Sequence, residues 1–127
     1  MKSFVFAICL LLAVTIFITA NAIKTVEHID EMLNIANSLP RNEEEFSSKE
    51  HIEKDVLSLI ELWDREFPAL AFTAGYDNTN RCDEAIGALA VHFRNNNGAD
   101  FAVALSEFCD GLYRLRILEG FHWEGIF

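Results

Sequence analysis

The sequence predicts an all-α protein, a small bundle of about four helices stapled by one disulfide. Three observations support this prediction. Apolar residues recur every three or four positions in four segments, which is the period of an amphipathic helix. The connections between these segments are short, as they are in helical bundles. The last two segments each carry one cysteine, Cys82 and Cys109.

The first 22 residues have the layout of a secretory signal peptide. Lys2 is their only charged residue, residues 4–18 are almost all apolar, and Ala20-Asn21-Ala22 fits an A-x-A cleavage site. We therefore expect a signal peptide, 1–22, and a single helical domain, 23–127, that is secreted and extracellular. A membrane anchor is the alternative, but the apolar run is short for a membrane span.

The first helix of the domain is expected from Thr25 to Leu39, with Thr25 as its cap and Pro40 as its end. The linker that follows is acidic around Glu43-Glu44-Glu45, and such a run of like charge predicts a solvated loop. The apolar stripe of the helix consists of Val26, Ile29, Leu33 and Ala36, with Met32 and Leu39 beside it.

A second helix is expected from a capping box of Ser47 and Glu50 to about Glu66, where Pro68 stops it. Residues 69–77 are apolar without a clear period, so we expect them to form a packed loop. The broad apolar face of this helix comprises Ile52, Val56, Leu59, Ile60, Trp63 and Phe67.

A helical hairpin is expected from Thr79 to Leu118. Residues 78–80 and Asp100 are suited to cap its two arms, and 95–98 to form its turn. Gly120 is expected to end the second arm. The stripe of the first arm is Cys82, Ile86, Leu89 and Phe93, and that of the second is Phe101, Leu105, Phe108, Leu112 and Leu115.

The two cysteines of the hairpin are expected to form its disulfide. A turn near Asn97 sets Cys82 roughly opposite Tyr113, about one helical turn beyond Cys109. Cys9 leaves with the signal peptide, and an oxidising compartment favours pairing of the remaining two thiols. Closing this loop would stabilise the fold by roughly 3.5 kcal/mol. The alternative is a pair of buried free thiols that pack as small hydrophobic side chains.

The charge of the chain restricts its partners. It has 20 acidic and 10 basic residues, so without Lys2 there are 9 basic residues and the net charge is −11. Nucleic acid and anionic lipid would be repelled, and we expect neither nucleic-acid binding nor stable membrane association. An acidic surface favours a basic partner.

No pattern in the sequence points to catalysis, a metal or a cofactor. The histidines form no H-E-x-x-H or cysteine–histidine zinc pattern, and there is no G-x-S-x-G elbow or glycine-rich phosphate loop. His28 with Glu31, and His51 with Asp55, share helical faces, which is common by chance. We therefore assign no catalytic, metal-binding or cofactor-binding residues and expect no enzyme activity.

Residues 47–70 resemble the front half of the secreted Turandot stress proteins of flies. The resemblance consists of a capped helix that ends in Glu66-Phe67-Pro68-Ala69-Leu70, and it covers at most a quarter of the chain. Nothing after Gly75 continues it, so it assigns no family.

These observations favour a secreted, non-enzymatic binding protein, such as a humoral, stress, immune or secretory-fluid factor. Its partner would be an extracellular protein, met through a patch of Glu43, Glu44, Glu45, Phe121 and Phe127. The alternative is a carrier that holds a small apolar ligand in a cavity of the bundle. That cavity would be lined by Trp63, Phe67, Phe93, Phe108 and Trp123.

Overall fold

The computed structural model describes residues 1–48 and 52–126, and it describes no side chains at 21, 22, 48, 73 and 119–126. Within these ranges the chain is helical and contains no strand, which confirms the all-α prediction. Four of the described helices are long and one, α2, is short. They are α1 (Lys2–Ser38), α2 (Glu43–Ser48), α3 (Ile52–Ala74), α4 (Tyr76–Arg94) and α5 (Gly98–Ile126).

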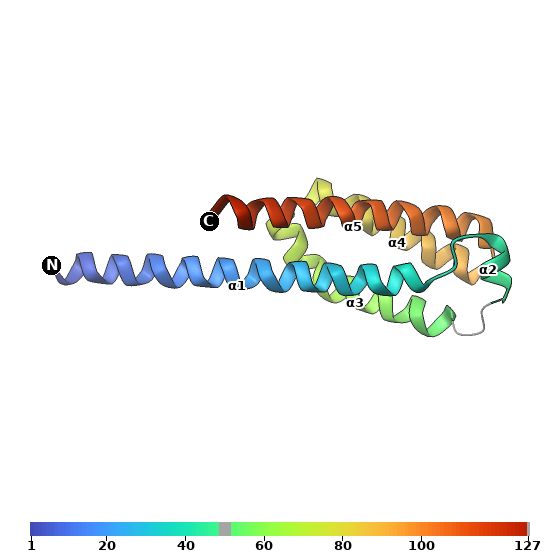
Figure 1. Ribbon diagram of the computed structural model, residues 1–127, viewed down its shortest axis with the longest axis horizontal. Helices are drawn as coiled ribbons and strands as arrows, with labels where there is room; N and C mark the ends of the chain where they lie inside the picture. Colours follow the sequence, from blue (N-terminus) through green and yellow to red (C-terminus); the bar gives the residue numbers. More distant parts are fainter. Residues whose placement is uncertain (49–51, 127) are drawn as a thin grey trace.

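The four long helices lie side by side, and α2 covers one end of the bundle (Figure 1). The first half of α1 projects beyond the other helices at the opposite end (Figure 1). The most extensive packing is between α4 and α5, followed by α1 with α5. The α4–α5 hairpin is therefore the surface on which the other helices assemble.

The predicted apolar stripes form the core. Among the α5 positions, all five that were expected are buried, and three of the four on α4 are buried, with Phe93 half-buried. The stripes of α1 and α3 also face inward, and Val26, Ile60 and Phe67 are half-buried at the edge of the core. The prediction of which residues make the core is confirmed at these positions.

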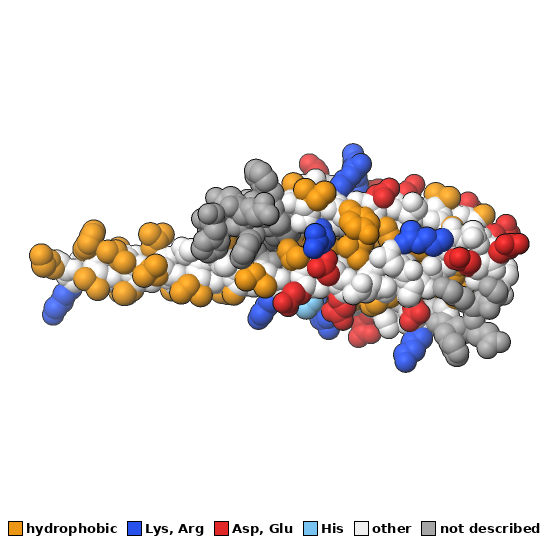
Figure 2. Space-filling view, viewed as in Figure 1, with side chains coloured by type: hydrophobic (Ala, Val, Ile, Leu, Met, Phe, Trp, Pro, Cys, Tyr) orange, Lys and Arg blue, Asp and Glu red, His pale blue; other side chains and the backbone are white. Residues whose placement is uncertain are grey.

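Burial along α1 changes abruptly near residue 25. The helix is continuous from Lys2 to Ser38, but its first apolar residues are exposed, and Figure 2 shows them along the projecting rod. Thr25 is only 5 % exposed, and Ile29 and Met32 are fully buried. By length and composition α1 could cross a membrane, and a signal sequence passes the same test.

The acidic segment is helical, so the prediction of a solvated loop was wrong. Asn42 caps α2, because its side-chain oxygen accepts from the amide of Glu45 at 2.8 Å, and Glu45 accepts in turn from the amide of Arg41 at 2.8 Å. Phe46 anchors the helix on the bundle through Phe93 and Phe101. The expected box of Ser47 and Glu50 lies partly outside the described residues.

Pro68 does not stop α3, which continues to Ala74, so the packed loop predicted for this segment was wrong. A proline inside a helix removes one backbone hydrogen bond. Burial of Leu70, which is 1 % exposed, accompanies the continued helix. Gly75 makes the break instead, with a φ of 91° that favours glycine.

The expected caps of the hairpin have other roles. Asn78 donates to the carbonyl of Ala74 at 2.7 Å and Thr79 to that of Gly75 at 3.1 Å, so both bind the α3–α4 junction. Asn97 rather than Asp100 caps α5, since its side chain accepts from the amide of Asp100 at 3.2 Å. The backbone of α5 continues past Gly120 to Ile126, so the predicted stop was wrong.

The predicted disulfide is absent: Cys82 and Cys109 are free and buried. The reason is the register of the hairpin. The sulfur of Cys82 occupies the space above Gly111, where a Cβ would overlap it and would lie 3.8 Å from the Cα of Cys82. Residues two positions apart on a helix point in nearly opposite directions, so a helix that turns Gly111 toward Cys82 turns Cys109 away.

This contact predicts opposite behaviour for two glycines of the hairpin. Gly87 has nothing within 4 Å of an added Cβ, whereas Gly111 meets Cys82. Both substitutions to alanine gain helix propensity, so Gly111→Ala should be less stable than Gly87→Ala by roughly 1–3 kcal/mol, the cost of overpacking. Urea unfolding of both variants measures this difference.

The double variant Gly111→Ala/Cys82→Ala removes the sulfur and supplies the control. It should recover part of the loss, as a coupling between two residues in contact. Equal stabilities of Gly111→Ala and Gly87→Ala would contradict the register described above.

Candidate functional site

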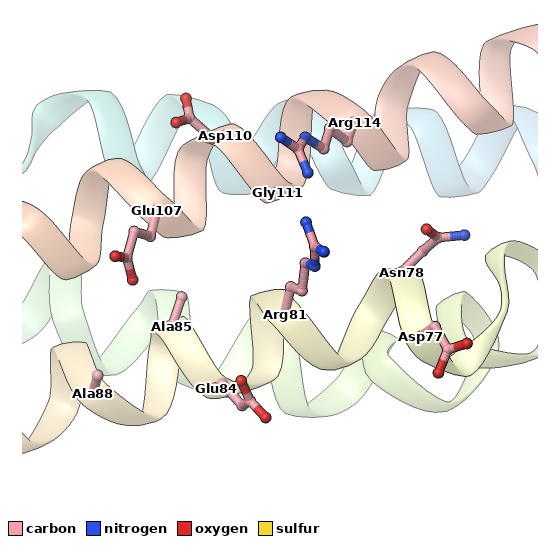
Figure 3. A pocket seen from close by; sticks show the side chains of 10 residues that line it. All are labelled: Asp77, Asn78, Arg81, Glu84, Ala85, Ala88, Glu107, Asp110, Gly111 and Arg114. Carbon is pink, nitrogen blue, oxygen red and sulfur yellow. The ribbon is translucent and has the colours of Figure 1, made fainter.

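A groove between α4 and α5, on the outer side of the hairpin, is the candidate site (Figure 3). Its volume is about 670 Å³, within the range of ligand-binding clefts. Both helices contribute small and charged side chains to it. The lining residues are Asp77, Asn78, Arg81, Glu84, Ala85, Ala88, Glu107, Asp110, Gly111 and Arg114.

Two arginines dominate the geometry of the groove. Figure 3 shows Arg81 reaching from α4 and Arg114 from α5, with the two guanidinium groups turned toward one another near Gly111. In the described part of the chain, no ion pair involves either residue. The close-up shows Glu107 directed toward the gap, whereas Glu84 and Asp110 point away from it.

The shape of the groove follows from the residues beneath it. Ala85, Ala88 and Gly111 lie in its lining and have little or no side chain. At Gly111 the space that a Cβ would fill is taken by the sulfur of Cys82, so α4 and α5 lie close together beneath the groove. The groove can therefore bring a bound group near the helix backbones and between two fork-shaped cations, which suit planar anions.

None of the groove residues was predicted as a site from the sequence, although the sequence contains a usable indication. A hairpin register that sets Cys82 opposite Tyr113 also sets Arg81 opposite Arg114. Two like charges that face each other across a helix pair are a reason to look for a ligand between them.

The aromatic residues expected to line a cavity fall into two clusters. Trp63 packs against Phe67 at 5.7 Å and Phe108 at 5.5 Å between ring centroids, and Trp63 and Phe108 have no exposed surface. Phe93 belongs to a separate cluster around Phe46 at the α2 end. The side chain of Trp123 lies outside the described residues. The structure therefore brings together three of the five.

The buried indole of Trp63 is held by a polar contact. Its Nε1–H donates to Oδ1 of Asp83 at 2.9 Å, which links α3 to α4. Asp83 itself is exposed, so the bond runs from the core to the edge of the bundle. A buried N–H needs such an acceptor, because leaving it unpaired is costly.

Among the residues of the expected partner patch, the three glutamates and the backbone of Phe121 lie toward opposite ends of the bundle. Glu43, Glu44 and Glu45 are exposed on α2, and Figure 2 shows acidic side chains at that end. The side chain of Phe121 and the whole of Phe127 lie outside the described residues. The backbone of residues 121–126 belongs to the last turns of α5, and a helix of 29 residues is roughly 40 Å long. The acidic part is therefore a surface of its own.

Both hairpin thiols are held in the protonated form. Burial, with the charge of Asp83 and the nearness of Cys109, raises the pKa of Cys82 to about 12. Burial also raises the pKa of Cys109, while Arg41 acts in the opposite direction. A protonated, buried thiol is a poor nucleophile and a poor metal ligand.

Charged contacts of His28 and Asp30 join α1 to α3 and α5. Nε2 of His28 lies 3.5 Å from Glu66 on α3, and Nδ1 lies 3.8 Å from Glu31. Arg116 donates to Asp30 at 2.6 Å, which raises the pKa of the guanidinium. Over the described residues, no three histidine, cysteine or acidic side chains come together as a metal site would require. His51 lies outside them.

No protein-family model, curated protein or solved structure matches the chain.

The Trp63–Asp83 bond predicts how substitutions at position 83 affect stability. Asp83→Ala leaves the indole N–H without its acceptor and should lower the free energy of unfolding by roughly 1–3 kcal/mol. Asp83→Asn keeps a carbonyl oxygen and should lose less. Asp64→Ala, at an exposed acid on α3, is the matched control. A loss in the control as large as in Asp83→Ala would show that charge, not the bond, is responsible.

The buried thiols predict how a thiol reagent reacts with the protein and how its stability depends on pH. A thiol reagent should modify Cys82 and Cys109 only after unfolding, because both are free and buried. The pKa of Cys82 is raised above its ordinary 9.0, so the unfolded chain ionises first as the pH rises. The stability that Cys82 contributes should be constant below pH 9 and decrease between about pH 9 and 12.

Comparison with Cys82→Ala separates this effect from the titration of lysines and tyrosines. The variant should lose less stability than the parent between pH 8 and pH 10.5 in urea unfolding. Equal losses of stability in the variant and the parent would contradict a protonated Cys82. If neither Cys82 nor Cys109 reacted after unfolding, the two cysteines would be joined by the predicted disulfide after all.

Proposed function

We propose that the chain is a secreted protein that loses residues 1–22 and acts outside the cell by binding another macromolecule, without catalysis of its own. The observation that carries the proposal is the position at which burial begins on α1. Among the described side chains, Thr25 is the first that is buried, three positions after Ala22, and the described apolar side chains before it are exposed.

Removal of the leader would leave the described core intact. Each buried residue of the core lies at or after position 25. The exposed apolar residues of 4–18 need an apolar surrounding, which a secretion channel or a bilayer provides. A signal peptide that is cut off after use accounts for both facts, and the remaining domain carries a net charge of −11, which favours solubility.

The position of the groove favours binding at the surface over a carrier function. Around Trp63 the rings of Phe67 and Phe108 are in contact, and Leu59 and Leu112 are fully buried as well. The 670 Å³ groove lies outside the core and is lined by charged and small residues. Such a groove suits a polar ligand group rather than a small hydrophobic molecule.

Expression of the full chain in a secreting eukaryotic cell tests the proposal. We expect protein in the medium whose mass corresponds to a start at Ile23, because Ala20 and Ala22 fit the cleavage site. Ala20→Leu with Ala22→Leu should block cleavage and keep the protein with the membranes. Ala13→Leu, which lies in the apolar run, is the control and should be cut normally. Full-length parent chain in the membrane fraction would contradict the proposal and identify an anchor.

Titration of the secreted protein with a naphthylamine dye distinguishes a binding protein from a carrier. A filled core predicts no saturable binding and no energy transfer from tryptophan. One-to-one binding that a fatty acid displaces would favour the carrier instead.

A further inference from the structure

Two unpaired cations face one another in the α4–α5 groove. The guanidinium groups of Arg81 and Arg114 are turned toward each other, and neither forms an ion pair within the described chain (Figure 3). Like charges so arranged repel, and an anion between them would remove the repulsion. Each guanidinium presents a planar fork of donors that matches the two oxygens of a carboxylate or phosphate.

The acidic residues around the groove restrict which anion can enter. Asp77, Glu84, Glu107 and Asp110 also line it, so four acidic residues accompany two cations, with Glu107 directed toward the gap and Glu84 and Asp110 away from it. The whole domain without its leader is acidic as well. A nucleic acid or another polyanion would be repelled on approach. A single carboxylate with positive charges on either side matches this arrangement of charges. The carboxylate faces the two arginines, and its flanking cations face the acidic residues of the lining, which we call the rim.

The size and floor of the groove favour a polypeptide as the source of this carboxylate. The groove extends over the lining from Asp77 to Ala88 on α4 and from Glu107 to Arg114 on α5, about three helical turns of the first helix. Its volume of 670 Å³ exceeds the needs of one carboxyl group. Because Ala85, Ala88 and Gly111 are small, a partner segment can lie along the groove close to both helices.

We propose that this groove binds a segment of a partner protein that carries one aspartate or glutamate flanked by lysine or arginine residues. The carboxylate lies between Arg81 and Arg114, and the flanking cations pair with the rim, Glu107 above all because it points into the gap (Figure 3). The inference rests on the proposed function, since it names the chemistry of the macromolecule that the protein binds.

Two labelled peptides test this proposal on the protein recovered from the secreting cells. The first is an alanine-rich helical peptide with a central glutamate and lysines four residues before and after it. The second has glutamine in place of the glutamate. Fluorescence anisotropy at low salt should show the glutamate peptide binding about tenfold or more tightly, as a charge-assisted bidentate contact predicts.

General attraction to an acidic protein predicts the opposite order, because the glutamine peptide is the more positive of the two. Arg81→Gln/Arg114→Gln should abolish the preference for glutamate. Arg94→Gln removes an exposed cation of α4 outside the groove and should keep it. Free acetate and inorganic phosphate, added as competitors at equal ionic strength, show whether an isolated anion occupies the same place.

The outcomes separate this inference from the proposed function. Equal binding of the two peptides, no binding at millimolar concentration, or an equal effect of Arg94→Gln would overturn the groove assignment. Displacement by acetate or phosphate as effectively as by unlabelled peptide would reduce the site to a small-anion site and overturn the polypeptide. None of these results alters the cleavage and dye measurements, which judge the proposed function. Thermal unfolding of each variant confirms that it is folded.

Discussion

The close approach of α4 and α5 at Gly111 and Cys82 determines much of the remaining structure. The sulfur occupies the space that a side chain at Gly111 would fill, and this fixes the register of the hairpin. Register in turn decides which side chains of the two helices meet on each side. On the inner side it aligns the apolar stripes against which α1 and α3 pack. On the outer side it places Arg81 and Arg114 on facing sides of one groove.

Apolar periodicity predicted the faces of the helices well and their ends poorly. The period is set by burial, which is the largest favourable term in folding, so stripes such as those of α4 and α5 follow directly from the sequence. Ends depend on smaller terms that tertiary contacts override. Pro68 costs one hydrogen bond, but the next turns place Leu70 in the core, and the helix continues. The end comes where Gly75 adopts a positive φ.

The short helix α2 also differs from the local prediction, because a segment expected to be a loop is helical. Three consecutive glutamates repel one another and suggest a solvated loop. Two local features favour the helix: the Asn42–Glu45 box satisfies the amide of Glu45 in its first turn and that of Arg41 just before it, and negative charge near an N-terminus is stabilising. A tertiary contact also stabilises the helix. The ring centroids of Phe46 and Phe101 are 5.2 Å apart, and a Cβ added to Gly98 would lie 3.0 Å from the Cβ of Phe46. Only the first two features are visible in the sequence.

The candidate site was predictable only in part, and the reason is again register. The sequence placed both cysteines on the correct helices, with a hairpin register two residues from that of the structure. For a disulfide this difference is decisive, since a shift of two residues turns a side chain to the other side of its helix. Long arginine side chains tolerate it, because several bonds can rotate to restore the meeting of their ends. A groove of long charged residues is thus a better inference from an approximate register than a covalent bond is.

The charges of the groove would impose two requirements on the proposed partner that are hard to meet together. An acidic domain attracts partners with net positive charge, and this attraction acts at long range and raises the rate of encounter. At contact, however, Arg81 and Arg114 reject a purely basic segment, because it would leave their repulsion in place and add to it. A polyanion satisfies the arginines but is repelled earlier by Asp77, Glu84 and Asp110. A segment with a carboxylate between two cations is attracted during the encounter and also at contact. A small surface can become selective through such a combination of attraction and repulsion.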